Sequence, residues 1–217
     1  MPGKLCPHLI LEGTRLTLKT ETAFALNEHP AFVGPRKYRY HSPIVSAEWC
    51  GFTDQPWGRG LVSYEPEEEA RAMEAYATWA RLFELLPYSS WILDRFHLST
   101  RAFQKAARGR DVDFAWLEER LLRLGFHVAL LTRTPSTFDT ARAERLKVSA
   151  NPAQYDDLSR FVAEQELLRS LAARSRLPVA EFDISDSDVG GVADRVVAWM
   201  WESGCLYAPE AGFAGAA

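Results

Sequence analysis

Residues 9–20 read Leu-Ile-Leu-Glu-Gly-Thr-Arg-Leu-Thr-Leu-Lys-Thr. The apolar run before Gly13 is typical of a short buried strand, and the residues after it are typical of a loop that leads into a helix. Gly13, Lys19 and Thr20 match a phosphate-binding pattern of glycine, four residues, glycine, lysine, and serine or threonine. In such a loop, backbone N–H groups surround phosphate oxygens, and the following helix points its N-terminus at them. The stretch therefore predicts an α/β fold with a phosphate site after its first strand.

The pattern fails at one position, because Leu18 stands where the second glycine belongs. Glycine there permits a positive φ and a close approach of the backbone to phosphate. A leucine with positive φ costs roughly 1–2 kcal/mol, whereas with negative φ it fits with its side chain turned away. Two interpretations stay open, a working loop and an ordinary turn with one exposed lysine. The first assigns nucleotide contacts to Gly13, Thr14, Arg15, Leu16, Thr17, Leu18, Lys19 and Thr20.

Strand-like and helix-like segments alternate along the chain, which predicts crossover units and a parallel sheet. We expect five strands, at residues 8–12, 36–41, 91–94, 126–132 and 177–184. We expect helices at residues 20–28, 67–86, 96–108, 114–124, 137–146, 154–175 and 189–202. Residues 42–66 contain no such pattern and are expected to form a long irregular binding loop. Ligands of such sheets bind beyond the carboxyl ends of the strands.

Composition limits the classes of protein that the chain can belong to. The 217 residues suit one domain, which we place at residues 1–204, followed by a flexible tail at 205–217. A net charge of −4 disfavours a nucleic-acid partner. No apolar run approaches the length of a membrane span, and no signal peptide is evident, so we expect no membrane partner. Three scattered cysteines predict reduced thiols in a cytoplasmic protein.

A second group of reactive residues follows the third predicted strand. Residues 94–104 read Asp-Arg-Phe-His-Leu-Ser-Thr-Arg-Ala-Phe-Gln. A carboxylate such as Asp94 can hold Mg²⁺ or accept a hydroxyl proton, and a guanidinium such as Arg95 can bind phosphate oxygens in a forked geometry. The alternative is structural, with Asp94 capping the next helix and Arg95 forming a surface salt bridge.

This second stretch resembles the thymidylate kinase family and, more broadly, the nucleoside and nucleoside monophosphate kinases of the P-loop class. The matching residues are Asp94, Arg95, Phe96, Ser99, Phe103 and Gln104. The resemblance implies a five-stranded parallel sheet flanked by helices, with ATP and Mg²⁺ as cofactors. It also implies an arginine-bearing lid at about residues 134–155.

The resemblance implies a role for each matching position. Lys19, Asp94, Arg95, Arg142 and Arg145 would be catalytic, with Thr20 and Asp94 holding the metal ion. Arg95, Ser99 and Gln104 would contact the acceptor. Arg142 and Arg145 also share a helix face, and on a charged helix that is usually only a solvated face.

Four further residues are candidates for acceptor contacts: Arg36, Tyr38, His41 and Trp57. Residues 36–41 combine cations with aromatic rings, which can hold a phosphate or a flat acceptor, although a solvated strand edge explains them as well. His41 and Glu48 could serve as a base near a strand end, and a polar loop role is the alternative.

Together these patterns predict an ATP-dependent small-molecule kinase that acts on a nucleoside, nucleotide or related acceptor. The alternative is a catalytically inactive binding protein with an altered phosphate loop. A homodimer is possible by resemblance, although no interface is legible in the sequence.

Overall fold

The computed structural model describes residues 7–33, 42–48, 60–86 and 89–206. Five parallel strands form one sheet in the order β2-β3-β1-β4-β5. They are β1 (His8–Glu12), β2 (Ile44–Ser46), β3 (Trp91–Asp94), β4 (His127–Thr132) and β5 (Val179–Asp183). The predicted fold class, a five-stranded parallel sheet flanked by helices, is confirmed. The predicted strand at residues 36–41 lies outside the described residues, whereas β2 lies inside the stretch that we expected to be irregular.

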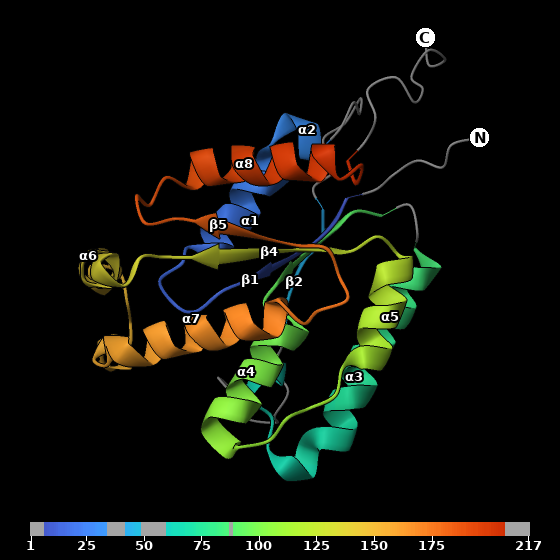
Figure 1. The fold of residues 1–217 in the computed structure, drawn as a ribbon, viewed down its shortest axis with the longest axis horizontal. Helices are drawn as coiled ribbons and strands as arrows, with labels where there is room; N and C mark the ends of the chain where they lie inside the picture. The colour runs from blue at the N-terminus through green and yellow to red at the C-terminus, as the bar shows by residue number, and fades with distance from the viewer. Residues whose placement is uncertain (1–6, 34–41, 49–59, 87–88, 207–217) are drawn as a thin grey trace.

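Helices cover both faces of this sheet (Figure 1). One face carries α1 (Lys19–Glu28), α2 (Pro30–Val33) and α8 (Val189–Glu202), and the other carries α3 (Glu69–Leu85), α4 (His97–Arg108), α5 (Ala115–Arg123) and α7 (Leu158–Ala172). The helix α6 (Phe138–Leu146) lies beyond the arrowheads of β4 and β5, at the carboxyl edge of the sheet. Short 3₁₀ helices occur at Leu61–Ser63, Pro66–Glu68, Pro135–Thr137 and Pro152–Tyr155.

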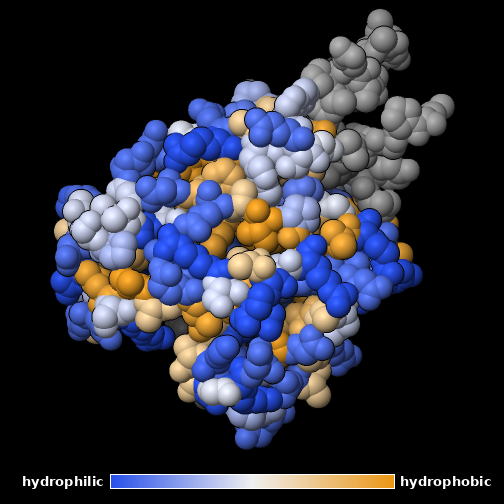
Figure 2. Space-filling view, in the orientation of Figure 1, coloured by the Kyte–Doolittle hydropathy of each residue, from blue (hydrophilic) through white to orange (hydrophobic). Residues whose placement is uncertain are grey.

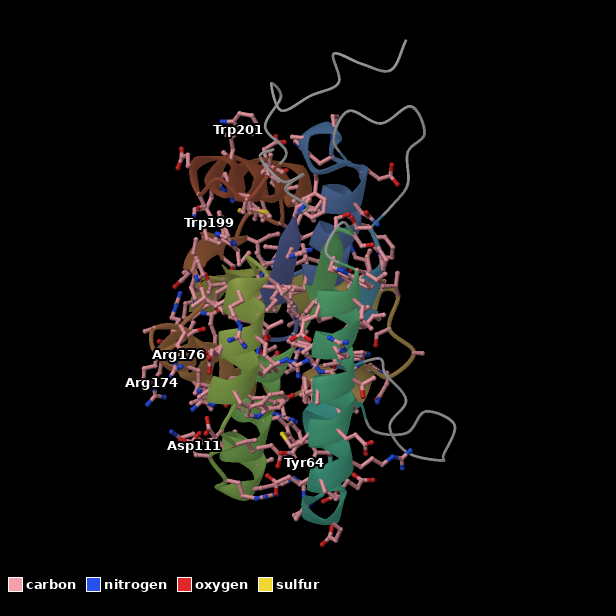
Figure 3. All side chains as sticks on the ribbon, turned by 90° about the vertical axis from the view of Figure 1, so that its right-hand side faces the viewer. Tyr64, Asp111, Arg174, Arg176, Trp199 and Trp201 are labelled. Carbon is pink, nitrogen blue, oxygen red and sulfur yellow. The ribbon has the colours of Figure 1, made fainter. Side chains whose placement is uncertain are left out.

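The central strand explains why the core has two halves. Successive side chains of a strand point to opposite faces, so Leu9 and Leu11 pack with α1, α2 and α8, whereas Ile10 packs with α3, α4 and α5. All of β1 is buried, which is why its sequence is a continuous apolar run. In the view from the opposite edge, α3 and α5 lie side by side (Figure 3). Most of the face seen in Figure 2 is hydrophilic, with smaller hydrophobic groups between.

Two predicted boundaries were wrong. The helix predicted at residues 154–175 begins at Leu158, because the Asp157 side chain caps it by accepting hydrogen bonds from the N–H groups of Ser159 and Arg160. Cys205 and Leu206, which we assigned to a flexible tail, are buried in the core beside α8. In the described part of the chain, no helix has the length and apolar character needed to cross a membrane.

Candidate functional site

The loop between β1 and α1 contains two leucines with positive φ. Leu16 has φ 68° and Leu18 has φ 50°, so position 18 adopts the left-handed conformation that favours glycine. Gly13 is required for a different reason, because a Cβ there would lie 2.6 Å from the carbonyl oxygen of Leu131. The backbone therefore follows a glycine-type path at position 18 although the residue is leucine.

Several contacts support this strained path. The carbonyl oxygen of Leu18 accepts hydrogen bonds from the backbone N–H (2.9 Å) and the hydroxyl (2.8 Å) of Thr22, in the first turn of α1. The Leu16 side chain packs in a small cluster with Phe138, Ala141, Tyr155 and Phe161, all from the predicted lid and the helix after it. The shape of the loop therefore depends on the packing of residues 138–161 against it.

Lys19 is the first residue of α1, and its ammonium group points back into the loop. The Nζ atom donates to the carbonyl oxygen of Thr14 at 2.6 Å, and the side chain is almost fully buried. Burial, followed by the nearby charge of Arg95, lowers the pKa of Lys19 to about 8. The Nζ atom also lies 3.5 Å from the Thr17 hydroxyl, so both of these partners are neutral oxygens. A buried ammonium group with neutral partners is well placed to bind an anion.

Thr20 and Asp94 bring two hard oxygen donors together at the end of β3. The Thr20 hydroxyl donates to Oδ2 of Asp94 at 2.6 Å, and Asp94 is 3% exposed. Mg²⁺ is usually held by one or two protein carboxylates together with phosphate oxygens and water. This pair fits that donor set, and the described residues contain no larger group of acidic, cysteine and histidine side chains that could hold a metal.

Arg95 follows β3 with a positive φ of 59°, and its guanidinium lies between two glutamates. Its Nε atom is 3.0 Å from Oε2 of Glu48, and its Nη1 atom donates to Oε1 of Glu164 at 3.3 Å. Burial alone would lower its pKa, but Glu48 and Glu164 raise it above the ordinary value. The Nη2 atom is buried and has no hydrogen-bond partner among the described residues. Among the described residues, this guanidinium therefore keeps one donor without a partner.

Glu48 is a site residue that the sequence analysis considered as a base, with a polar loop role as the alternative. It follows β2, and its carboxylate contacts both Arg15 (Nη2 to Oε1, 2.9 Å) and Arg95. Burial would raise its pKa, but Arg95, Arg15 and Lys19 outweigh burial and lower it. Gly60 fixes this segment, because a Cβ at position 60 would lie 2.0 Å from the carbonyl oxygen of Glu48.

Glu164 on α7 completes the arrangement, and the sequence analysis missed it. It accepts a hydrogen bond from the Thr14 hydroxyl at 2.6 Å as well as from Arg95. It lies in a charged helix in which nothing distinguishes it from its acidic neighbours, so the sequence carried no signal for it. Its two contacts join α7 to the phosphate loop and to the end of β3.

Arg133 is another residue that the sequence analysis missed. It follows β4, is 1% exposed, and donates from Nε to the carbonyl oxygen of Leu16 at 3.1 Å. Its other nitrogens donate to the carbonyl oxygen of Ser185 (3.1 Å) and the hydroxyl of Ser187 (3.0 Å). Burial lowers its pKa despite nearby Asp183 and Asp186. Arg133 therefore holds the phosphate loop against the loop after β5.

Ser99 and Gln104, from the motif at residues 94–104, do not face the site. The hydroxyl of Ser99 donates to Glu12, whose carboxylate also accepts the backbone N–H groups of Phe96 and Leu98 and so caps α4. Gln104 donates to the carbonyl oxygen of Tyr64 at 2.9 Å. Ser99 and Gln104 have no exposed surface, so the structure does not bring them to a cavity. Glu12 faces the start of α4 and not the Thr20–Asp94 pair.

The two lid arginines differ. Arg145 donates to the Tyr155 hydroxyl at 3.1 Å and lines a cavity beside the phosphate loop. Arg142 donates to Asp156 at 3.4 Å and does not line either described cavity. The predicted acceptor residues Arg36, Tyr38, His41 and Trp57 lie outside the described residues.

Two cavities meet at the carboxyl edge of the sheet. The first, which we name the donor cavity for the role proposed for it below, has a volume of about 470 Å³ and is lined by Lys19, Thr20, Arg133 and Arg145 among others. The second, which we name the acceptor cavity after the same proposal, has a volume of about 550 Å³ and lies between α4, α7 and the 3₁₀ turn Leu61–Ser63. Both are lined by Arg15, Glu48 and Arg95, which we call the junction. The site thus consists of two chambers that share one charged wall.

Comparison with known proteins supports the fold that this site implies. No protein-family model and no curated protein matches the chain. Among solved structures, the YorR protein of Bacillus subtilis in complex with phosphorylated GDP is similar with a TM-score of 0.61 and 17% identity, over 91% of this chain and 97% of that one. A sugar kinase from Janibacter sp. gives 0.54 and 11% identity over 94% and 96%. Deoxyadenosine kinase from M. mycoides with bound dATP gives 0.55 and 12% over 88% and 98%. The chain therefore has an α/β fold of the P-loop kinase type.

Proposed function

We propose that this protein is an ATP-dependent kinase that transfers the γ-phosphoryl group to a hydroxyl group of a small molecule. The observation that carries this proposal is the shared wall of the two cavities. A phosphoryl transfer needs donor and acceptor to meet in line at one point, with positive charge around the phosphorus. The junction supplies such a point between a phosphate-loop cavity and a second cavity.

The donor side holds the triphosphate. Lys19 would leave the Thr14 carbonyl oxygen and bind the β- and γ-phosphates, while the N–H groups of residues 13–20 surround them. Thr20 and Asp94 would hold Mg²⁺, directly or through water. The ion, when bound, supplies charge neutralisation at the phosphate oxygens. Arg145 would approach the phosphates from the lid.

Glu48 and Arg95 have separate roles at the junction. Glu48 accepts the proton of the attacking hydroxyl, and its lowered pKa keeps it ionised near neutral pH. The hydroxyl oxygen forms a bond to the γ-phosphorus, the bond from that phosphorus to the bridging oxygen breaks, and ADP leaves. Arg95 turns its free Nη2 atom to the transferred group.

The same charges argue for a hydroxyl acceptor over a phosphate acceptor. Glu48 and Glu164 both line the acceptor cavity and pair with Arg95, which offsets its positive charge. Arg15, which pairs with Glu48, and the exposed Arg160 also line this cavity. An acceptor that carries its own phosphate would place two more negative charges against these carboxylates. We therefore assign an alcohol acceptor and not a nucleotide monophosphate.

The test combines binding and turnover. Calorimetry should detect ATP–Mg²⁺ binding in the native protein and not in Lys19→Met, and ADP release that depends on an acceptor should be lost in Glu48→Gln with ATP binding retained. The alternative, a nucleotide-binding protein without transfer, predicts ATP binding and no ADP release with any alcohol. Absence of ATP binding at millimolar nucleotide would refute both.

A further inference from the structure

The helix α4 presents an apolar surface to the acceptor cavity. The family resemblance implies that polar residues of this helix contact the acceptor. Its polar motif residues Ser99 and Gln104 are fully buried on other partners. The residues of α4 that line the cavity are Ala102, Phe103, Ala106 and Ala107. Ser99 and Gln104 therefore face the core of the protein, and the cavity receives the other side of the helix.

The helix α7, on the other side of the cavity, also presents apolar residues to it. Ala163 and Leu167 of α7 line the cavity, as does Phe161. Residues 160, 163, 164 and 167 are spaced three and four apart, so they lie on one helical face. Alanines at 102, 106, 107 and 163 create the width of this slot, because larger side chains would fill the space between the two helices. We call the apolar part of the lining the alanine slot, which consists of Ala102, Phe103, Ala106, Ala107, Phe161, Ala163 and Leu167.

The polar and apolar parts of the cavity lie at different ends. Arg95 lies two residues before the start of α4 at His97. Ala106 lies nine residues beyond His97, which is about 14 Å along the axis at 1.5 Å per residue. The junction charges thus lie at one end, and the alanine slot extends away from them. An acceptor whose hydroxyl lies at Glu48 must place the rest of its body along the slot.

Ala106, Ala107 and Ala163 are exposed to solvent, so an acceptor that lies on them displaces water from apolar walls. Polar groups of the acceptor that face these walls would lose hydrogen bonds to that water. Each donor or acceptor atom that leaves water without a partner costs about 1–3 kcal/mol. Beyond the junction and Glu164, the polar side chains that line the described part of the cavity are Ser63 and Arg160, and Arg160 is exposed. The edges of a nucleobase and the several hydroxyls of a sugar need more partners than these. An apolar body needs none and is stabilised by the buried contact area.

We propose that the acceptor is a neutral alcohol with an apolar body, aromatic or branched aliphatic, that lies in the alanine slot with its hydroxyl at Glu48. This proposal rests on the proposed kinase function and adds the chemical class of its acceptor. The cavity volume of about 550 Å³ is within the range of small-molecule sites and holds a body of one or two rings.

The experiment compares acceptors that all carry a primary hydroxyl group. Cinnamyl alcohol and geraniol represent apolar alcohols, and thymidine, deoxyadenosine and D-glucose represent polar ones. Acceptor-dependent ADP release is measured for each, together with phosphate-ester formation by phosphorus NMR. We expect kcat/KM for at least one apolar alcohol to exceed every polar acceptor by about tenfold or more. Binding of the same alcohols is measured by calorimetry in the Glu48→Gln variant, which keeps the slot.

Two variants locate the bound alcohol. Ala106→Trp fills the slot from α4, and Ala163→Trp fills it from α7, so both should weaken the alcohol by about tenfold or more while the affinity for ATP–Mg²⁺ changes less than about twofold. Lys105→Trp is the matched control, because it adds the same side chain to an exposed position of α4 that does not line the cavity. It should leave alcohol binding unchanged.

The outcomes separate this proposal from the function on which it rests. If thymidine, deoxyadenosine or glucose is the best acceptor, the acceptor class is wrong and the kinase function stands. If the alcohols bind equally well to the Ala106→Trp and Lys105→Trp variants, the slot is not their site. If they bind in the slot but ATP–Mg²⁺ does not bind, the kinase function fails and the slot remains an alcohol site.

Discussion

The Nε atom of Arg133 donates a hydrogen bond to the carbonyl oxygen of Leu16, which joins the end of the fourth strand to the left-handed part of the phosphate loop. The same guanidinium reaches Ser185 and Ser187 on the loop after β5. A residue that touches both loops controls the width of the donor cavity between them.

We predict that Arg133→Met releases the phosphate loop. The carbonyl oxygens of Leu16 and Ser185 would lose their donors, and each unpaired buried group costs about 1–3 kcal/mol. The backbone hydrogen bonds between residue 133 and Gln165 would remain, so the fold should persist. Urea unfolding should report the loss, and calorimetry should report weaker ATP binding. Arg123→Met, on an exposed arginine of α5, should change neither quantity.

At position 18 we expect glycine to give a more stable protein than alanine, the opposite of the usual order in a helix. Both Leu18→Ala and Leu18→Gly lose the leucine packing, but only glycine relieves the left-handed strain of roughly 1–2 kcal/mol. The glycine variant should therefore be the more stable of the two by about 1 kcal/mol in urea unfolding. In the helix interior the order is opposite, so Ala25→Gly should destabilise by about 1 kcal/mol. An alanine variant as stable as the glycine variant would contradict the left-handed conformation.

Lys19 should show a pH-dependent effect on stability. Its pKa is lowered to about 8 in the folded protein, below its ordinary value of 10.5, so the folded state favours the neutral amine. The cost of the buried charge is complete below pH 8 and disappears as pH rises towards 10.5. Lys19→Met should thus be more stable than the native protein at pH 7, by roughly 1–3 kcal/mol, and this advantage should shrink between pH 8 and 10. A difference that stays constant with pH would exclude the shift.

The same shift predicts proton uptake when the nucleotide binds. At pH 8.5 most of Lys19 is neutral in the free protein, and the phosphates would favour its charged form. Calorimetry in two buffers of different ionisation enthalpy measures the number of protons taken up. We expect uptake at pH 8.5 and almost none at pH 6.5, where Lys19 is already charged.

Phe138 should affect nucleotide binding from a distance. It is fully buried and does not line either cavity, but it packs against Leu16. Phe138→Ala removes the support of the left-handed leucine, whose cost of 1–2 kcal/mol corresponds to roughly tenfold in Kd. We therefore expect ATP to bind the Phe138→Ala variant roughly tenfold more weakly, as measured by calorimetry. Phe24→Ala, on an exposed phenylalanine of α1, is the control and should not change it.

Glu118 should contribute to stability and not to the site. It is buried and accepts hydrogen bonds from His97, the Ser175 hydroxyl and the backbone N–H of Arg176, on the edge seen in Figure 3. Burial would raise its pKa, but these hydrogen bonds lower it to about 2. The stabilisation of the folded state by the ionised Glu118 is therefore present above about pH 4.5 and is lost as pH falls towards 2. Glu118→Gln should destabilise by roughly 2–3 kcal/mol at pH 7, with little difference at pH 2.5 and unchanged ATP affinity.

The sequence predicted those parts of the fold that are coded locally. The strands β1, β3 and β4 are apolar runs bounded by turns, and burial on both faces makes such runs unambiguous. The short edge strand β2 has three half-buried residues, too few for a pattern. It exists because it pairs with β3, a contact between segments more than forty residues apart.

The candidate site shows the same limit. Lys19, Thr20, Asp94 and Arg95 were identified because two short motifs contain them, and the structure brings them together. Glu48 and Glu164 come from separate elements and meet only in the folded chain. Ser99 and Gln104 match the motif, but a match of residue types does not determine which face of α4 is buried. Their roles as acceptor contacts, and that of Arg142 in catalysis, stay predictions.

The two cavities share Arg15, Glu48 and Arg95 among the described residues that line them, while the rest of each wall comes from different elements. Under the proposed kinase function, random mutagenesis confined to the alanines of α4 and α7 should therefore produce variants with new acceptor preferences and an unchanged phosphate donor. Substitutions at the three shared positions would instead alter both cavities at once. We therefore expect these positions to tolerate substitution least.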